Sequence, residues 1–207
     1  PLMIIEEIVD KMEKFCYVTE DTEQSLMFAI AKDVKIQIEF NPNQVKAYRL
    51  IGYENRKLRP EDFKNDAIDA GELGSNHSVT ALYEIIPAGS KSKFYTEADE
   101  LKYTTTTPTE NKYTNELATI KFRYKKPDGD QSIEMVQTIE NKSILLQNAS
   151  DDFKFSNAVA WFGLKLRDSK LIANSSSKDI IALAKQGLSN DSEGYKAEFI
   201  RLVEAAN

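Results

Sequence analysis

Apolar and polar residues alternate through the middle of the chain. From Val34 to Phe40 every second residue is apolar and the residues between them are polar, which predicts a strand with one buried face. The Asn-Pro-Asn sequence at residues 41–43 is turn chemistry, so it predicts a hairpin between this strand and a second one over residues 45–53. Further strands are predicted over residues 79–86, 117–124 and 133–139, and a Pro-Asp-Gly turn separates the last two.

The period changes to 3.6 residues in the last quarter of the chain. A helix is predicted over residues 153–168, and a second one follows the capping pair Ser176 and Asp179. Asp191 or Ser192 is expected to cap a last helix, whose predicted buried stripe comprises Tyr195, Phe199, Leu202 and Val203. Because isolated helices of this length are marginal, we expect them to pack on the sheet or on a neighbour.

The first residues of the chain have a third pattern. Residues 2–15 predict an amphipathic helix, residues 15–19 a short strand, and Asp21 opens a second predicted helix that runs through Ile30. This start has no basic flank and no small-residue cleavage site, so it does not predict a signal peptide.

Together these patterns predict an α+β fold. An antiparallel β-sandwich or sheet is expected to pack with C-terminal helices, preceded by a short helix-strand-helix segment. The expected parts are residues 1–31, residues 32–149 and residues 150–207. Two long polar connections, residues 54–78 and 88–115, interrupt the strands, and loops of this length are either functional or disordered.

Composition narrows the classes of function. The 207 residues carry a formal net charge of -6, and the densest basic cluster is the pair Lys125 and Lys126, so nucleic-acid binding is not expected. No run of apolar residues approaches the length of a membrane-spanning helix. A single cysteine excludes an internal disulfide and a zinc site built from cysteines.

Few catalytic arrangements are compatible with the sequence. Gly-x-Gly-x-x-Gly, Walker and Gly-x-Ser-x-Gly motifs are absent. His77, the one histidine, could serve a hydrolase only beside a nucleophile such as Cys16 or Ser78, and otherwise orders a turn before a strand. A hydrolase that uses loop carboxylates, or Cys16 with His77, is the alternative hypothesis, and no catalytic residue or cofactor is predicted.

An acidic loop and a group of aromatic residues are the candidate binding features. Asp66, Asp69 and Glu72 could supply oxygen ligands to calcium, but they lack the spacing of an EF-hand loop, and a solvated acidic loop is the simpler interpretation. Aromatic residues in the second long connection are the better candidates for contact with a partner, together with His77: they are Phe94, Tyr95, Tyr103 and Tyr113.

Several stretches of this sequence, in the same order, resemble one bacterial family. That family is the region C-terminal to the von Willebrand factor type A domain in YfbK-like proteins. The matching stretches are residues 31–42, 48–56, 69–72 with His77, 80–85, 117–129, 162–169 and 195–203.

The resemblance implies a domain of uncharacterised function in an exported or envelope-associated protein, with residues 1–31 as the end of the preceding type A domain. Such type A domains have a doubly wound α/β fold and a metal site with the pattern Asp-x-Ser-x-Ser, which this sequence lacks. The family's glycine-containing approach to the strand is also replaced by Lys-Phe-Cys-Tyr at residues 14–17. We therefore expect a non-catalytic interaction or structural module of a bacterial envelope protein, with a cell-envelope protein as its partner.

Overall fold

The computed structural model describes residues 29–53, 55, 57–74, 79–92, 94–95, 113–172 and 176–206. The chain divides into two compact units, at residues 1–142 and 143–207. Each unit is described by itself. The predicted helix-strand-helix segment falls almost wholly outside the described residues. Its last residue, Ile30, lies in a strand, so the expected helix does not extend that far.

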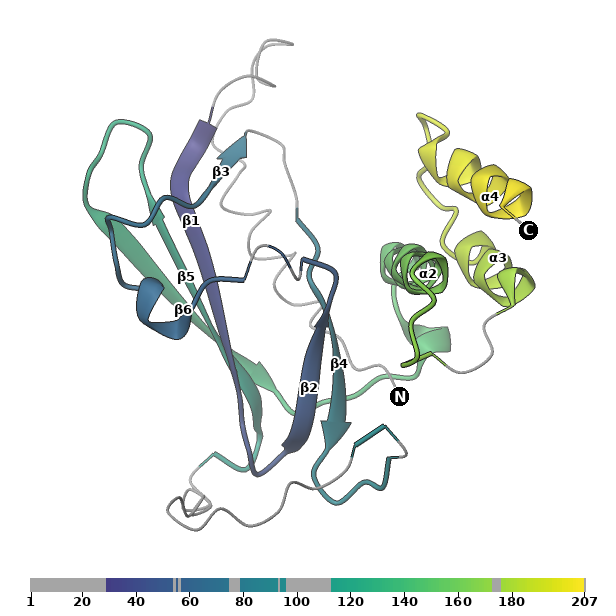
Figure 1. The fold of residues 1–207 in the computed structure, drawn as a ribbon, viewed down its shortest axis with the longest axis horizontal. Coiled ribbons are helices and arrows are strands. Elements are labelled where there is room, and N and C mark those ends of the chain that lie inside the picture. The colour runs from purple at the N-terminus through teal and green to yellow at the C-terminus, as the bar shows by residue number, and fades with distance from the viewer. Residues whose placement is uncertain are drawn as a thin grey trace. The chain divides into compact units, whose positions relative to one another are not determined.

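The described residues of the first unit form six antiparallel strands in two sheets (Figure 1). The four-stranded sheet has the order β3-β1-β5-β6, and the smaller sheet pairs β2 with β4. The bounds are β1 Ala29–Phe40, β2 Val45–Ile51, β3 Gly71–Gly74, β4 Leu82–Pro87, β5 Glu116–Lys125 and β6 Ser132–Glu140. The antiparallel sheets and the helices of the second unit confirm the α+β fold class.

The predicted hairpin between β1 and β2 is wrong. β1 pairs with β3 and β5, whereas β2 pairs with β4. The turn after Phe40 therefore carries the chain from one sheet to the other. The Asn41 side chain stabilises this turn, since it accepts a bond from Asn43 N–H and donates to the carbonyl oxygens of Tyr113 and Glu116. The predicted hairpin between β5 and β6 is confirmed.

The two sheets share one apolar core. Phe40 on β1, Val45 on β2, Ile85 on β4 and Ile139 on β6 belong to a single buried cluster with Leu117, Ala118 and Ile120 of β5. The Phe40 ring lies 4.5 Å from the Tyr48 ring and 5.6 Å from the Tyr83 ring, centroid to centroid. Because the second sheet has only two strands, the arrangement is a partly covered sheet and does not close into a sandwich.

The first long connection contains structure that the sequence pattern did not reveal. A 3-10 turn, η3 (Pro60–Asp62), and strand β3 (Gly71–Gly74) lie within the segment predicted to be a loop. β3 is four residues long, with glycine at both ends, and bulges interrupt its pairing with β1. A strand this short has no measurable period, which explains why it was missed.

In the second unit the described residues form three helices, preceded by the 3-10 turn η4 (Leu146–Asn148). They are α2 (Asp151–Leu166), α3 (Ser177–Lys185) and α4 (Tyr195–Ala205). The predicted cap of α3 is confirmed, since the Ser176 hydroxyl accepts a bond from Asp179 N–H. The N-cap residue of α4 is Gly194, neither of the two predicted residues, but the carboxylate of Asp191 still accepts bonds from Lys196 and Ala197 N–H at the start of the helix.

A glycine determines how closely these helices approach. A Cβ atom at Gly187, just after α3, would lie 2.4 Å from the Asp151 carbonyl oxygen and 2.7 Å from Phe155 Cβ. The fully buried side chains around this contact include Ile180 and Val203. The predicted stripe of α4 is only partly correct: Val203 is buried, but Tyr195 and Leu202 are exposed.

Candidate functional site

The acidic connection folds against the four-stranded sheet as a loop that we call the anchored loop, residues 59–70. Lys35 of β1, which is only 2% exposed, provides one fastening point. Its ammonium group donates to the carbonyl oxygens of Asn65 at 2.6 Å and Asp62 at 3.4 Å. Phe63, between these two residues, is buried as well. An apolar ring and a buried cation thus hold the same turn.

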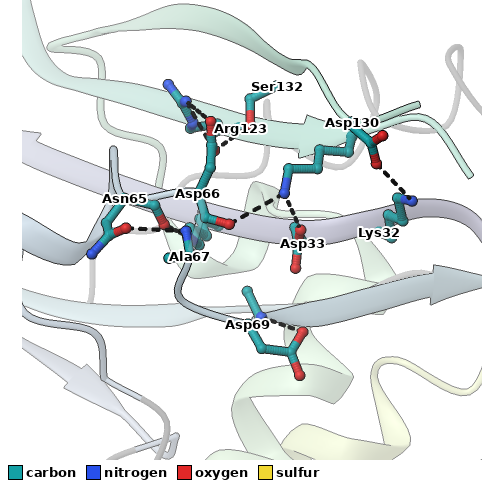
Figure 2. Close-up of polar contacts among 12 residues, drawn as sticks. Lys32, Asp33, Asn65, Asp66, Ala67, Asp69, Arg123, Asp130 and Ser132 are labelled. Carbon is teal, nitrogen blue, oxygen red and sulfur yellow. Dashed lines mark hydrogen bonds and ion pairs between the residues drawn. The ribbon is translucent and has the colours of Figure 1, made fainter.

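Asp66 provides a second fastening point, shown in Figure 2. Arg123 of β5 donates to both carboxylate oxygens of Asp66, at 3.0 and 3.1 Å, and the Ser132 hydroxyl of β6 donates at 2.6 Å. Lys125 donates to the Asp66 carbonyl oxygen at 3.3 Å and lies 2.6 Å from the Asp33 carboxylate. The loop is therefore bonded to three strands of the sheet.

Basic neighbours keep the carboxylates of this region ionised. The pKa of Asp33 is lowered by the hydrogen bond from Lys125, and that of Asp62 by the hydrogen bond from Arg59. The pKa of Asp66 is lowered by Ser132 and then by Arg123. A general acid at neutral pH needs the opposite shift, toward a raised pKa. These carboxylates are thus suited to structural ion pairs.

The three candidate calcium ligands do not converge. The Asp66 oxygens are taken by Arg123 and Ser132, the Asp69 carboxylate accepts from Ala70 N–H, and Glu72 lies exposed on β3. Across the described residues, no group of three or more His, Cys, Asp or Glu side chains could hold a metal ion.

The described aromatic candidates lie on the segments that flank residues 96–112. Phe94 and Tyr113 are 45% and 55% exposed. The Lys46 ammonium group lies 5.0 Å from the centre of the Tyr95 ring. We call these three aromatic residues the aromatic end. Cys16, His77 and Tyr103 lie outside the described residues, so the Cys16 and His77 arrangement and the role of Tyr103 stay predictions.

Backbone bonding fixes the position of Tyr113. Asn41 donates to its carbonyl oxygen at 2.8 Å, and Gln44 donates to the Thr114 carbonyl oxygen at 2.9 Å. Asn141, after β6, donates in turn to the Gln44 side chain at 2.7 Å. The exposed Tyr113 ring is therefore carried on a turn that amide side chains tie to the rest of the first unit.

Sequence reasoning missed the basic residues that hold the anchored loop. Lys35 occupies a polar position of an alternating strand, where a solvated side chain is the normal expectation. Arg123 and Lys125 alternate in the same way along β5. Three basic residues on two strands, together with an acidic loop, are the one signal that could have suggested ion pairs.

None of the helices in the described residues is both long and apolar enough to span a membrane.

Comparison with known proteins gives one consistent result. The family model described as "Uncharacterized protein YfbK, C-terminal" matches residues 25–207. "Uncharacterized protein YfbK" of Escherichia coli (strain K12) is 40% identical over 201 residues, which are 96% of this chain and 34% of the relative. The chain thus spans about a third of the length of that relative. No solved structure matches the chain.

Proposed function

The chain belongs to the family of the YfbK C-terminal domain, and on this premise we propose that it is a non-catalytic protein-interaction module in a bacterial envelope protein. In this proposal the module accompanies a von Willebrand factor type A domain, whose last elements lie in residues 1–31. The partner is a protein of the cell envelope, and it contacts the aromatic end.

One observation is the main support for the interaction role. Phe94 and Tyr113 are large aromatic side chains that stay about half exposed, and Tyr113 is held on a turn tied by Asn41 and Gln44. Aromatic residues that are exposed yet held in place lose little conformational entropy on binding, which is why such residues dominate protein interfaces. The anchored loop supports a structural role, because its carboxylates are engaged by basic side chains.

The alternative, a hydrolase that uses loop carboxylates, has less support. An acid catalyst needs a carboxyl group whose pKa is raised by burial or by a like charge. The pKa values of Asp33, Asp62 and Asp66 are all lowered by their partners.

Site-specific photo-crosslinking in the full-length protein, in its own bacterium, tests the interaction role. A photoreactive phenylalanine analogue at Tyr113 or Phe94 is expected to give a discrete adduct with an envelope protein. The matched control is the same analogue at Tyr195, an exposed tyrosine of the second unit. The proposal fails if neither position gives an adduct, or if Tyr195 gives the same adducts at equal yield.

The gene sequence upstream of Pro1 tests the second part of the proposal separately. An Asp-x-Ser-x-Ser pattern followed by alternating strands and helices is expected there. A different domain upstream would reject the association with a type A domain and leave the crosslinking result unaffected.

A further inference from the structure

The free edges of the two sheets differ in how well they are protected against pairing. β3 has four residues and bulged pairing, β4 has six residues and ends at Pro87, and β2 carries Lys46 and Arg49. Short strands, bulges, proline and charged side chains, lysine above all, are the devices that keep sheet edges from pairing with other chains. β6 is nine residues long, contains no proline, lysine or arginine, and has Glu134 and Glu140 as its charged residues.

The outer edge of β6 has no strand beside it among the described residues, where β5 is its one partner. Asn141 N–H donates to the Asn115 carbonyl oxygen, so the backbone of Asn141 faces β5. Because backbone groups alternate along a strand, the N–H and C=O groups of Glu134, Val136 and Thr138 point away from β5. The Thr138 carbonyl oxygen accepts a bond from the Gln137 side chain at 2.7 Å, which a second strand would share or displace. Val136, the middle residue of the strand, is 59% exposed.

We propose that two copies of this chain pair through β6, antiparallel about a two-fold axis at Val136, to form one continuous eight-stranded sheet. In this register Val136 lies opposite its symmetry mate, and Glu134 lies opposite Thr138 of the second copy. All of these residues present their backbone bonding groups outward, as an antiparallel ladder requires. The interface is isologous, so the same strand serves both copies.

The charges of β6 are compatible with this register. Glu134 lies opposite Thr138 and Glu140 opposite Ser132, so no two like charges lie directly opposite. An axis centred on Gln137 would place Glu134 opposite Glu140 of the second copy. An axis centred on Glu134 would place the two Glu134 residues opposite each other. Glu134 also lies 3.8 Å from Arg123 of β5, which reduces its repulsion of a second acidic strand.

Symmetric cysteine crosslinking tests the register on the full chain. In a Cys16→Ser background, Val136→Cys places two thiols opposite each other, with Cα atoms about 5.5 Å apart, a separation that a disulfide spans. Thr138→Cys is the matched control, since its symmetry mate lies roughly 13 Å further along the second strand. We expect a disulfide-linked dimer under mild oxidation from Val136→Cys, formed at least about tenfold faster than from Thr138→Cys.

A charge-swap pair tests the same contact without covalent chemistry. Sedimentation analysis of the unmodified chain is expected to show a dimer whose fraction rises with concentration. Val136→Lys and Val136→Glu should each be monomeric, because like charges then lie opposite at the axis, and an equimolar mixture of the two should recover the dimer. Val136→Thr keeps the β-branched shape and should leave the dimer intact.

Three results would overturn the proposal: an unmodified chain that is monomeric at every concentration, equal crosslinking rates for the two cysteine variants, or no recovery in the mixture. A monomeric chain whose Val136→Cys variant crosslinks to another protein would assign this edge to a different extended segment. None of these outcomes bears on the aromatic end, so they leave the proposed function untouched.

Discussion

The anchored loop and the aromatic end both belong to long polar connections, yet their side chains differ in bonding and exposure. The anchored loop is rich in charge, but Lys35 and Lys125 donate to its backbone carbonyl oxygens and Arg123 donates to its Asp66 carboxylate. At the aromatic end, the side chains of Phe94 and Tyr113 remain about half exposed. Charge in a loop therefore does not by itself indicate a binding site, and exposed aromatic residues on a fixed turn are the better indication.

The largest expected effect comes from the apolar part of the anchored loop. Phe63→Ala should lower the free energy of unfolding by about 3 kcal/mol, because it leaves a cavity where a buried ring was. Chemical denaturation followed by circular dichroism measures the loss. Leu58→Ala, at an exposed position just before the loop, is the control and should change the stability by less than about 0.5 kcal/mol. Equal losses would show that the loop does not pack as described.

The buried lysine gives the next largest effect. Lys35→Met keeps the length of the side chain but removes the donor to the Asp62 and Asn65 carbonyl oxygens. Leaving buried acceptors unsatisfied should cost about 2 kcal/mol, and amide hydrogen exchange should rise across residues 59–70. Lys32→Met is the control, since the ion pair that Lys32 makes within the described part of the chain is with the fully exposed Asp130, at 3.9 Å. Unchanged exchange in Lys35→Met would contradict the anchoring role.

Acid should weaken the anchored loop before it affects the aromatic end. The pKa values of Asp33, Asp62 and Asp66 are lower in the folded chain than their ordinary value of 3.8, so the unfolded chain binds protons more readily. Their stabilising contribution is complete above about pH 5 and is lost as the pH falls through the lowered values. Denaturation midpoints measured from pH 7 to pH 2 should show this fall.

Two variants make the acid effect specific. Asp66→Asn should reduce the stability at neutral pH and flatten the acid limb, because a neutral amide no longer titrates beside Arg123. Glu72→Gln should leave the acid limb as it is, since the Glu72 side chain lies exposed on β3. Identical profiles for the two variants would show that Asp66 is not the fastening carboxylate.

The smallest effect on stability is expected at the aromatic end. Phe94→Ser and Tyr113→Ser should each change the free energy of unfolding by less than about 0.5 kcal/mol, because both side chains are already about half exposed. When the photoreactive analogue stands at one of these two positions and serine at the other, the yield of partner adducts should nevertheless fall several-fold. A loss of stability similar to that of Phe63→Ala would reassign these rings to the core.

Local patterns in the sequence predicted most of the strands and helices. The alternation before Phe40, the turn after Lys125 and the cap at Ser176 were sufficient for the elements that they mark. Strand pairing was less predictable, because the Asn41 side chain bonds to Tyr113 and Glu116, residues far along the chain.

The candidate site was harder to predict for the same reason. The partners of the anchored loop are separated from it by up to 66 residues, as Ser132 is from Asp66. Nothing in the local sequence around Asp66 distinguishes a metal ligand from an ion-paired carboxylate. In α4, helical spacing gave the right element, but it did not reveal that Tyr195 and Leu202 are exposed.

The central claim is that basic side chains hold the acidic loop against the sheet, and we propose this structural role for it in place of catalysis or metal binding. The most direct test is an NMR titration of the Asp66 carboxyl carbon, with and without calcium ions. We predict a midpoint below 3.8 and no change on adding calcium, because Ser132 and Arg123 already occupy the carboxylate. A midpoint above about 5, or a shift induced by calcium, would contradict the claim.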